Sequence, residues 1–293
     1  MVGLFVVMSE LEERSAVERE LNPKIKEFGI VTYIRNIMEA EEVTSRHTDI
    51  VSGIIILVAS GGTEAMINQI VFQSGKPVLL WANPERNSLP SALEAYAVLG
   101  SRFPIKLMYA EIGSEEAKIE IRRFIRISDS ILALDNSVIG CIGAPSPWLL
   151  TSHGLQSMDT FKTEIKRIKT DELISRVDTV DEASTKPVLE YIQESIPNHD
   201  VPSDDIKRAA AVCVALKSLV TEHGLTAVTI RCFDLIPHGF TACLAIALSN
   251  DNGITAGCEG DLETTLTMMT VTGVSKQPCW MANVVRANTR ENR

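Results

Sequence analysis

The chain has 293 residues, of which 45% are hydrophobic and 23% are charged, so it is long enough to form two compact domains. Its longest apolar run, residues 209–216, is far shorter than the roughly 20 residues that a membrane-spanning helix needs. The formal net charge of −10 argues against unspecific binding to nucleic acid or to an anionic membrane, and it favours small molecules or divalent cations as partners.

The N-terminus and the cysteines indicate the cellular compartment. No basic stretch leads into a cleavable apolar segment, so we expect a cytoplasmic protein. The six cysteines are widely spaced, never form a CxxC pair, and stand mostly among apolar neighbours. They are therefore predicted to be small buried residues, without a disulfide framework or a zinc finger.

Apolar, β-rich runs alternate with segments of helical periodicity along the first half of the chain. Strands are predicted at residues 3–8, 54–60, 77–82 and 105–109. Helices are predicted at residues 10–28, 63–73, 89–99 and 114–128. This alternation is typical of a parallel sheet flanked by helices.

The second half repeats the pattern less regularly. Strands are predicted at residues 138–143, 164–168, 227–232 and 254–257, and an extended segment at 279–285. Helices are predicted at residues 172–180, 203–223, 239–248 and 262–272, with an exposed linker at 196–202. The fold class is therefore α/β, with two Rossmann-like three-layer domains.

Three carboxylates follow two of the predicted strands. Asp234 ends one strand, and Glu259 and Asp261 follow another, with Gly260 allowing a tight turn between them. Neighbouring strands in one sheet would bring these side chains into a single pocket, where hard oxygen ligands suit Mn²⁺ or Mg²⁺. The alternative is structural: Asp261 caps the helix that begins at Leu262, and Asp234 is a loop acid.

A small-residue turn, Ser60-Gly61-Gly62-Thr63, joins a buried strand to a helix. Its backbone N–H groups could hold an anion or a hydroxyl-rich ligand. The spacing is neither GxGxxG nor a P-loop, and a plain turn with Thr63 as the helix cap is the alternative.

Two further side chains could touch a ligand. Trp148 follows two prolines in a loop after a strand, where it could stack on a sugar ring or pack between domains. His238 lies before the helix predicted from Gly239 and could be an acid–base group or a ligand, although a single loop histidine is more often neither. The absence of a GxSxG motif disfavours covalent hydrolysis.

Four short motifs together resemble the L-fucose isomerase / L-arabinose isomerase family, especially its short prokaryotic fucose isomerase-like branch. They are Ser-Gly-Gly-Thr-Glu at 60–64, Gly-Ala-Pro-Ser-Pro-Trp at 143–148, Cys-Phe-Asp-Leu at 232–235 and Cys-Glu-Gly-Asp at 258–261. The resemblance covers nearly the whole chain, and the Glu-Gly-Asp segment is its most specific part. It implies an N-terminal α/β domain at 1–136, a second α/β domain with the acidic site at 137–275, and the start of a β-rich C-terminal domain at 276–293, where the sequence ends as if truncated.

The resemblance also implies an activity. Members of this family interconvert aldoses and ketoses through an enediol at a Mn²⁺ site, and they assemble into trimers or hexamers. Glu259 and Asp261 match the metal ligands, and Asp234 approximately matches the catalytic acid, so Asp234 and Glu259 form the expected acid–base pair. The two roles of Glu259 conflict and stay open. The family's third metal ligand, a C-terminal histidine, has no match before Arg293.

The residues alone leave two alternatives to an isomerase. A non-catalytic sugar-binding or regulatory protein derived from the isomerase fold would bind a small sugar without converting it. An acyl- or phosphoryl-transfer enzyme would use the turn of Ser60, Gly61, Gly62 and Thr63 as an anion cradle. The expected substrate-binding residues are Ser60, Gly61, Gly62, Thr63, Trp148 and His238.

Overall fold

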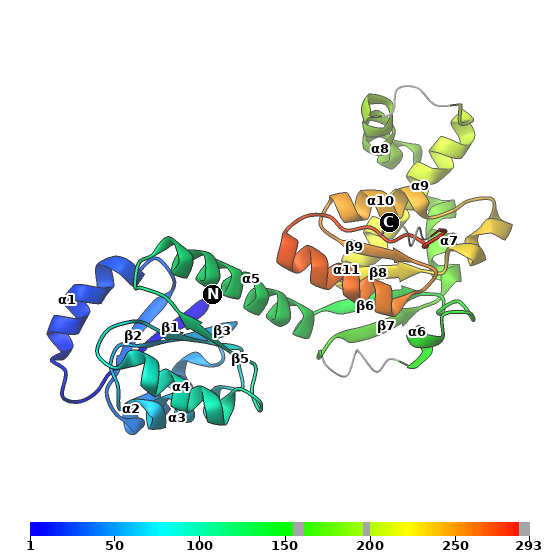
Figure 1. The fold of residues 1–293 in the computed structure, drawn as a ribbon. Helices are drawn as coiled ribbons and strands as arrows, with labels where there is room; N and C mark the ends of the chain where they lie inside the picture. The colour runs from blue at the N-terminus through cyan, green and yellow to red at the C-terminus, as the bar shows by residue number, and fades with distance from the viewer. Residues whose placement is uncertain (155–160, 196–199, 287–293) are drawn as a thin grey trace. The chain divides into compact units, whose positions relative to one another are not determined.

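Two parallel sheets, each with helices on both faces, organise the chain (Figure 1). The computed structural model describes residues 1–154, 161–195 and 200–286. The chain divides into two compact units, Met1–Leu132 and Ala133–Arg293. The α/β fold class predicted from the sequence is confirmed.

The first unit contains a five-stranded sheet in the order β2-β1-β3-β4-β5, with all described pairs parallel. Its strands are β1 (Val2–Val7), β2 (Ile30–Ile34), β3 (Gly53–Val58), β4 (Val78–Ala82) and β5 (Ile105–Tyr109). Its helices are α1 (Arg14–Ile25), α2 (Ile37–His47), α3 (Glu64–Ser74), α4 (Ser88–Leu99) and α5 (Glu115–Asp135). The three central strands are fully buried, as expected for a parallel sheet covered on both faces.

Helices α1 and α5 bury their apolar residues against one face of this sheet, and α2, α3 and α4 cover the other. The four strands and four helices predicted for this half are confirmed, but α1 is shorter than predicted and α5 continues to Asp135. Strand β2 and helix α2 were not predicted from the sequence. Strand β2 is a partly exposed edge strand, so its periodicity is weak, whereas α2 has a clear start because Asn36 Oδ1 accepts a hydrogen bond from Glu39 N at 2.9 Å.

The second unit contains a four-stranded parallel sheet in the order β7-β6-β8-β9. Its strands are β6 (Val138–Ile142), β7 (Glu164–Ile168), β8 (Ala227–Ile230) and β9 (Thr255–Cys258). Its helices are α6 (Leu150–Gly154), α7 (Thr170–Thr179), α8 (Glu182–Ser195), α9 (Ser203–His223), the 3-10 helix η2 (Cys232–His238), α10 (Cys243–Asp251) and α11 (Leu262–Ser275).

The predicted strands and helices of this half are found with some differences. Helices α6 and α8 were not predicted, and η2 occupies the end of the predicted strand 227–232 and delays the next helix to Cys243. Gly239 ends η2 with φ +79°, a left-handed conformation that favours glycine. Residues 278–286, which include the segment predicted to be extended, form neither helix nor strand. Of the predicted linker, residues 196–199 lie outside the described residues.

Strand order creates a crevice in the second sheet. Strands β6 and β8 are neighbours, and the chain leaves them toward opposite faces: α6 after β6 packs against α11, whereas α10 after β8 packs against α9. In open α/β sheets, ligands bind outside the carboxyl ends of strands at such a reversal. None of the helices in the described part of the chain is long and apolar enough to cross a membrane.

Candidate functional site

A pocket of about 670 Å³ lies at the carboxyl ends of β7, β6 and β8. This volume falls within the range of small-molecule sites, about 300 to 1,000 Å³. The lining residues come from the three strand ends, from the start of α7 and from η2: Gly143, Ala144, Arg167, Ile168, Lys169, Thr170, Asp171, Ile174, Arg231, Asp234 and His238. The structure thus brings Asp234 and His238, both predicted from the sequence, into one pocket.

Asp234 is held in this pocket from two sides. Its Oδ1 lies 3.1 Å from Arg231 Nε, and its Oδ2 lies 3.5 Å from the hydroxyl of Thr170, the first residue of α7. The side chain is 37% exposed, so a ligand in the pocket can reach it. Asp234 is therefore oriented by the ends of β8 and β7 together, rather than standing as an isolated loop acid.

Gly143 forms part of the pocket wall because it carries no side chain. It has φ +87°, and a Cβ atom there would lie 2.9 Å from Thr170 Oγ1 and 3.0 Å from Arg231 Cβ. Positive φ and the close approach both favour glycine at this position. The absence of a side chain at Gly143 leaves free space beside Asp234.

The charges around the pocket favour an anionic ligand. Three cationic side chains, Arg167, Lys169 and Arg231, line the pocket together with the two carboxylates of Asp171 and Asp234. Since Arg231 is paired with Asp234, the exposed Arg167 and Lys169 are the cations available to a ligand.

Glu259 lies in the neighbouring turn after β9. Its Oε2 accepts a hydrogen bond of 2.7 Å from Trp148 Nε1, and the Trp148 ring meets the Phe233 ring edge-to-face at 5.5 Å. Trp148 is 58% exposed and Phe233 47%. Trp148 therefore presents an aromatic surface to solvent beside a carboxylate.

Two loops approach each other closely at this turn. Glu259 has φ +61°, and its carbonyl accepts a hydrogen bond of 3.0 Å from Ser146 N. A Cβ atom on Gly260 would lie 2.6 Å from Ala144 O, so the 143–148 loop packs on this backbone only because residue 260 is glycine. The Gly-Ala-Pro-Ser-Pro-Trp and Cys-Glu-Gly-Asp motifs are thus in direct contact.

Asp261 adopts the structural alternative considered for it. Its Oδ1 accepts hydrogen bonds of 2.9 Å from both Thr264 N and Ser152 Oγ, and its Oδ2 accepts one of 2.7 Å from Thr264 Oγ1. The side chain caps α11 and the residue is only 9% exposed. Its carboxylate is already well supplied with donors from the protein.

The fit of these residues to a divalent cation is partial. Within the described residues, no group of three or more His, Cys, Asp or Glu side chains is placed to hold a metal ion. No hydrogen bond or ion pair between described residues joins Asp234 to Glu259 or Asp261. Glu259 and Asp261 could supply two of the several oxygen ligands that Mn²⁺ or Mg²⁺ needs, so the metal and the ligand roles stay predictions.

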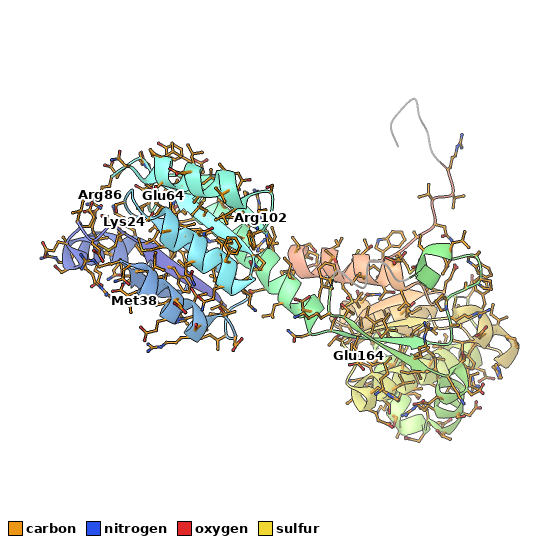
Figure 2. The ribbon with its side chains drawn as sticks, turned by 90° about the horizontal axis from the view of Figure 1, so that it is seen from below. Lys24, Met38, Glu64, Arg86, Arg102 and Glu164 are labelled. Carbon is orange, nitrogen blue, oxygen red and sulfur yellow. The ribbon has the colours of Figure 1, made fainter. Side chains whose placement is uncertain are left out.

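The turn of Ser60, Gly61, Gly62 and Thr63 belongs to the first unit. Ser60 Oγ accepts a hydrogen bond of 2.8 Å from Ser9 N, and Thr63 Oγ1 lies 3.0 Å from Ser91 Oγ. Both hydroxyl side chains are buried, and Gly61 N donates to Arg86 O (2.8 Å; Arg86 is labelled in Figure 2). Only Gly62, with φ +76° and open space around it, is free of such contacts, and substrate binding by this turn stays a prediction.

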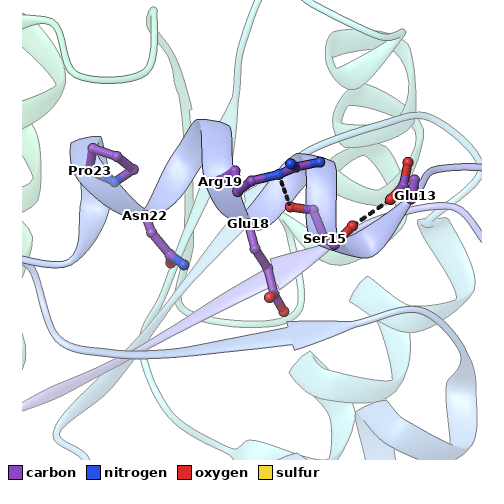
Figure 3. Close-up of a pocket in the computed structure, with 6 residues that line it drawn as sticks. All are labelled: Glu13, Ser15, Glu18, Arg19, Asn22 and Pro23. Atoms are coloured by element: carbon purple, nitrogen blue, oxygen red, sulfur yellow. Dashed lines mark hydrogen bonds between the residues drawn. The ribbon is translucent and has the colours of Figure 1, made fainter.

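A second hollow of about 730 Å³ runs along α1, and Figure 3 shows its lining residues. They are Glu13, Ser15, Glu18, Arg19, Asn22 and Pro23. All of them belong to one helix and its cap, and Arg19 Nε and Ser15 already bond within that helix. This hollow therefore lacks the convergence of several strand ends that marks the pocket of the second unit.

Four of the pocket residues were not predicted from the sequence: Arg231, Thr170, Arg167 and Lys169. The sequence held a signal for three of them. Arg231 follows β8, and Lys169 and Thr170 follow β7, so they stand at strand ends, where Asp234 was also expected. The order of the strands was needed to bring them together.

The sequence matches no known protein-family model. The chain is similar to the sulfoquinovose isomerases of Alkalicoccus urumqiensis, at 22% identity over 231 residues, and of Clostridium sp. (strain MSTE9), at 23% over 246 residues. These matches cover 74% and 78% of this chain but 52% and 55% of the relatives, so the chain spans about half the length of the curated relatives that it matches.

Among solved structures, similarity is found to a periplasmic solute-binding protein from Actinobacillus succinogenes 130z with bound D-allose and to a carbohydrate transporter from Acidothermus cellulolyticus 11B in complex with myo-inositol. The identities are 12% and 13%, and both TM-scores are 0.24. The matches cover 97% and 96% of this chain, and 96% and 89% of the others. The similarity to the sulfoquinovose isomerases supports the expected resemblance as a distant likeness to sugar isomerases, and the narrower likeness to fucose and arabinose isomerases stays a prediction.

Proposed function

We propose that the chain is an aldose–ketose isomerase, or the sugar-binding part of one, whose substrate is a small sugar with an anionic group. The observation that supports this most is the pocket at the reversal between β6 and β8, where Asp234 and His238 lie beside the turn that holds Glu259. The likeness to sulfoquinovose isomerases supports the reaction class.

The proposed reaction moves a proton between C1 and C2 of an open-chain sugar through an enediol. Asp234, oriented by Arg231 and Thr170, would remove the proton from C2, and Glu259 would deliver one to C1. The hydroxyl proton of O2 would pass to O1, and exchange with solvent would return both carboxyl groups to their starting states. Both carboxylates are partly exposed, so each can reach a bound sugar. Trp148 would stack on the sugar and hold Glu259 in place through its indole N–H.

Recognition of the anionic group is assigned to the exposed cations of the pocket. Arg167 and Lys169 would bind a sulfonate, carboxylate or phosphate, with His238 as a further donor. A guanidinium can form two parallel hydrogen bonds to such a group, which favours Arg167 as the main contact. The backbone around Gly62 remains a proposed second contact for sugar hydroxyls.

A divalent cation, Mn²⁺ by family habit, remains part of the proposal. Glu259 and Asp261 would hold it with further ligands, and the bound ion would stabilise negative charge on the sugar oxygens at C1 and C2. Glu259 cannot bind the ion and carry the proton in the same step, so its role is left open between the two. Assembly into a trimer or hexamer and a cytoplasmic location are proposed on the resemblance alone.

The test is isomerase turnover of the full chain with Mn²⁺, on a panel of neutral and anionic aldoses. Asp234→Asn should lower kcat by about 10² to 10⁴, because a general base typically contributes that much. Asp251→Asn, at the exposed end of α10, makes the same charge change outside the pocket and should leave turnover intact.

Equal turnover of Asp234→Asn and wild type would refute the role of Asp234. A preference for neutral over anionic aldoses would refute the proposed substrate class. It would leave the acid–base roles of Asp234 and Glu259 unaffected.

A non-catalytic sugar-binding protein is the second candidate. The lack of a three-ligand metal group among the described residues favours it, because binding needs the pocket but not the metal. Saturable binding of an anionic sugar with no turnover in Mn²⁺, Mg²⁺ or Co²⁺ would select this reading over the isomerase.

A further inference from the structure

Two cysteine sulfurs meet beside the candidate site. Cys258 is the last residue of β9, and Cys232 is the first residue of η2, directly after the neighbouring strand β8. Their Sγ atoms are 2.9 Å apart, with the thiol of Cys258 donating to Cys232. A disulfide bond, at about 2.05 Å, would need the sulfurs to approach by less than roughly 1 Å.

The surrounding structure holds both residues in position. Strands β8 and β9 are paired in register, with Ile230 opposite Cys258, and Thr229 Oγ1 donates to the carbonyl of Cys258 at 3.3 Å. Both cysteines are partly exposed, so a small oxidant can reach them, whereas Cys141 is buried. Proximity fixed by a sheet and access to an oxidant both favour a reversible disulfide.

The pair also lies within the segments that carry the candidate acid–base residues. Arg231 and Asp234 flank Cys232 along the chain, and Glu259 directly follows Cys258. A bond between the two sulfurs would tie η2 to the turn of Glu259 and restrain the separation of their carboxylates. Cysteine oxidation would therefore act on the geometry of the site.

We propose that Cys232 and Cys258 form a reversible intrachain disulfide that controls this site, with a low-molecular-weight disulfide such as oxidised glutathione as the oxidant. Cys232, whose sulfur accepts the hydrogen bond, attacks the oxidant as the thiolate and releases one glutathione thiol. Cys258 then loses its proton and attacks the Cys232 sulfur, releasing the second glutathione thiol. The two cysteines give up two electrons and two protons in total, and the oxidant is reduced to two thiols.

The first test uses the full wild-type chain and needs no variant. The reduced protein is equilibrated with defined ratios of reduced and oxidised glutathione, the remaining thiols are alkylated, and the non-reduced digest is analysed by mass spectrometry. We expect a linked peptide that contains Cys232 and Cys258 as the main product, reversed by dithiothreitol. Full alkylation of both cysteines at the most oxidising ratio, or pairing of either with Cys243, would overturn the proposal.

Variants assign the order of attack. In Cys258→Ser, Cys232 should accumulate as a mixed disulfide with glutathione because the resolving thiol is gone. Cys243→Ser removes the exposed thiol at the start of α10 and should leave the linked peptide unchanged. A Cys258→Ser protein that gives no glutathione adduct, while its circular dichroism matches the wild type, would contradict Cys232 as the attacking thiol.

The control of the site rests on the proposed function and is measured separately. We expect oxidised wild type to turn over sugar about tenfold to 100-fold more slowly than reduced wild type, since small displacements of reacting groups have effects of this size. Unchanged turnover with the linked peptide present would overturn the control role. A linked peptide in a protein that shows no turnover in either state would leave the disulfide standing and would instead count against the isomerase.

Discussion

At the scale of single residues, Glu259 and Asp261 have different surroundings although one glycine separates them. The left-handed backbone of Glu259 directs its carboxylate to Trp148, whereas Asp261 turns back to cap α11. The motif Glu-Gly-Asp therefore serves two purposes in this fold. One carboxylate stays accessible, and the other stabilises the element that follows.

Trp148→Phe tests the accessible carboxylate. The phenyl ring keeps the edge-to-face contact with Phe233, but Glu259 loses its indole donor. Since a hydrogen bond to a charged group contributes about 1.5 to 3 kcal/mol, we expect kcat/KM to fall by about tenfold to 100-fold. The matched control is Trp280→Phe, whose side chain is 77% exposed in the segment after α11. Equal kcat/KM values for the two variants would contradict a positioning role for Trp148.

At the scale of elements, strand ends and helix starts decide where the polar groups lie. The 3-10 helix η2 carries Phe233, Asp234 and His238 over the end of β8, and α7 begins with Thr170 at the end of β7. The candidate site is therefore made by short connections at one edge of a sheet, where parallel α/β folds place their ligands.

The cap of α11 gives a prediction for an element. Asp261→Ala leaves Thr264 N without its acceptor and also removes the partner of Ser152. Loss of a helix cap costs about 1 to 2 kcal/mol, which should lower the Tm of the second unit by roughly 2 to 8 °C in calorimetry. Asp204→Ala is the control, because Asp204 lies in the first turn of α9 without capping it. An equal loss in both variants would mean that charge near a helix start, rather than the cap, is responsible.

At the scale of the whole molecule, the two compact units provide an internal comparison. Each unit has a parallel sheet between two layers of helices, and Asp234, Glu259 and Asp261 all lie in the second unit. A ligand that binds at these residues should therefore stabilise one unit of the chain directly.

Titration with Mn²⁺ tests this. If the ion binds at Glu259 and Asp261, saturation at a hundred times its Kd adds about 2.7 kcal/mol to the free energy of unfolding of the second unit. Calorimetry should show the transition of that unit moving upward, with removal by EDTA restoring it. Glu259→Gln should abolish the shift. An unshifted second unit in Mn²⁺, Mg²⁺ and Co²⁺ would remove the metal from the proposal for this chain.

The sequence by itself determined the α/β class, most helices and strands, and the placement of Glu259 directly after a strand. These features depend on the periodicity of apolar residues and on turn residues, both of which can be read from a short stretch of sequence. Elements with weak local signals were missed, such as the partly exposed β2 and the 3-10 helix η2.

Only the tertiary structure decided which strand ends become neighbours. The order β7-β6-β8-β9 brings Thr170 and Gly143 to Arg231 and Asp234, and it places Cys232 against Cys258 although the sequence indicated no cysteine pair. It also places Ser152 beside Asp261, where the Ser152 hydroxyl donates to the Asp261 carboxylate. Strand order and register arise from hydrogen bonds between segments far apart in the chain, so no local pattern of residues specifies them.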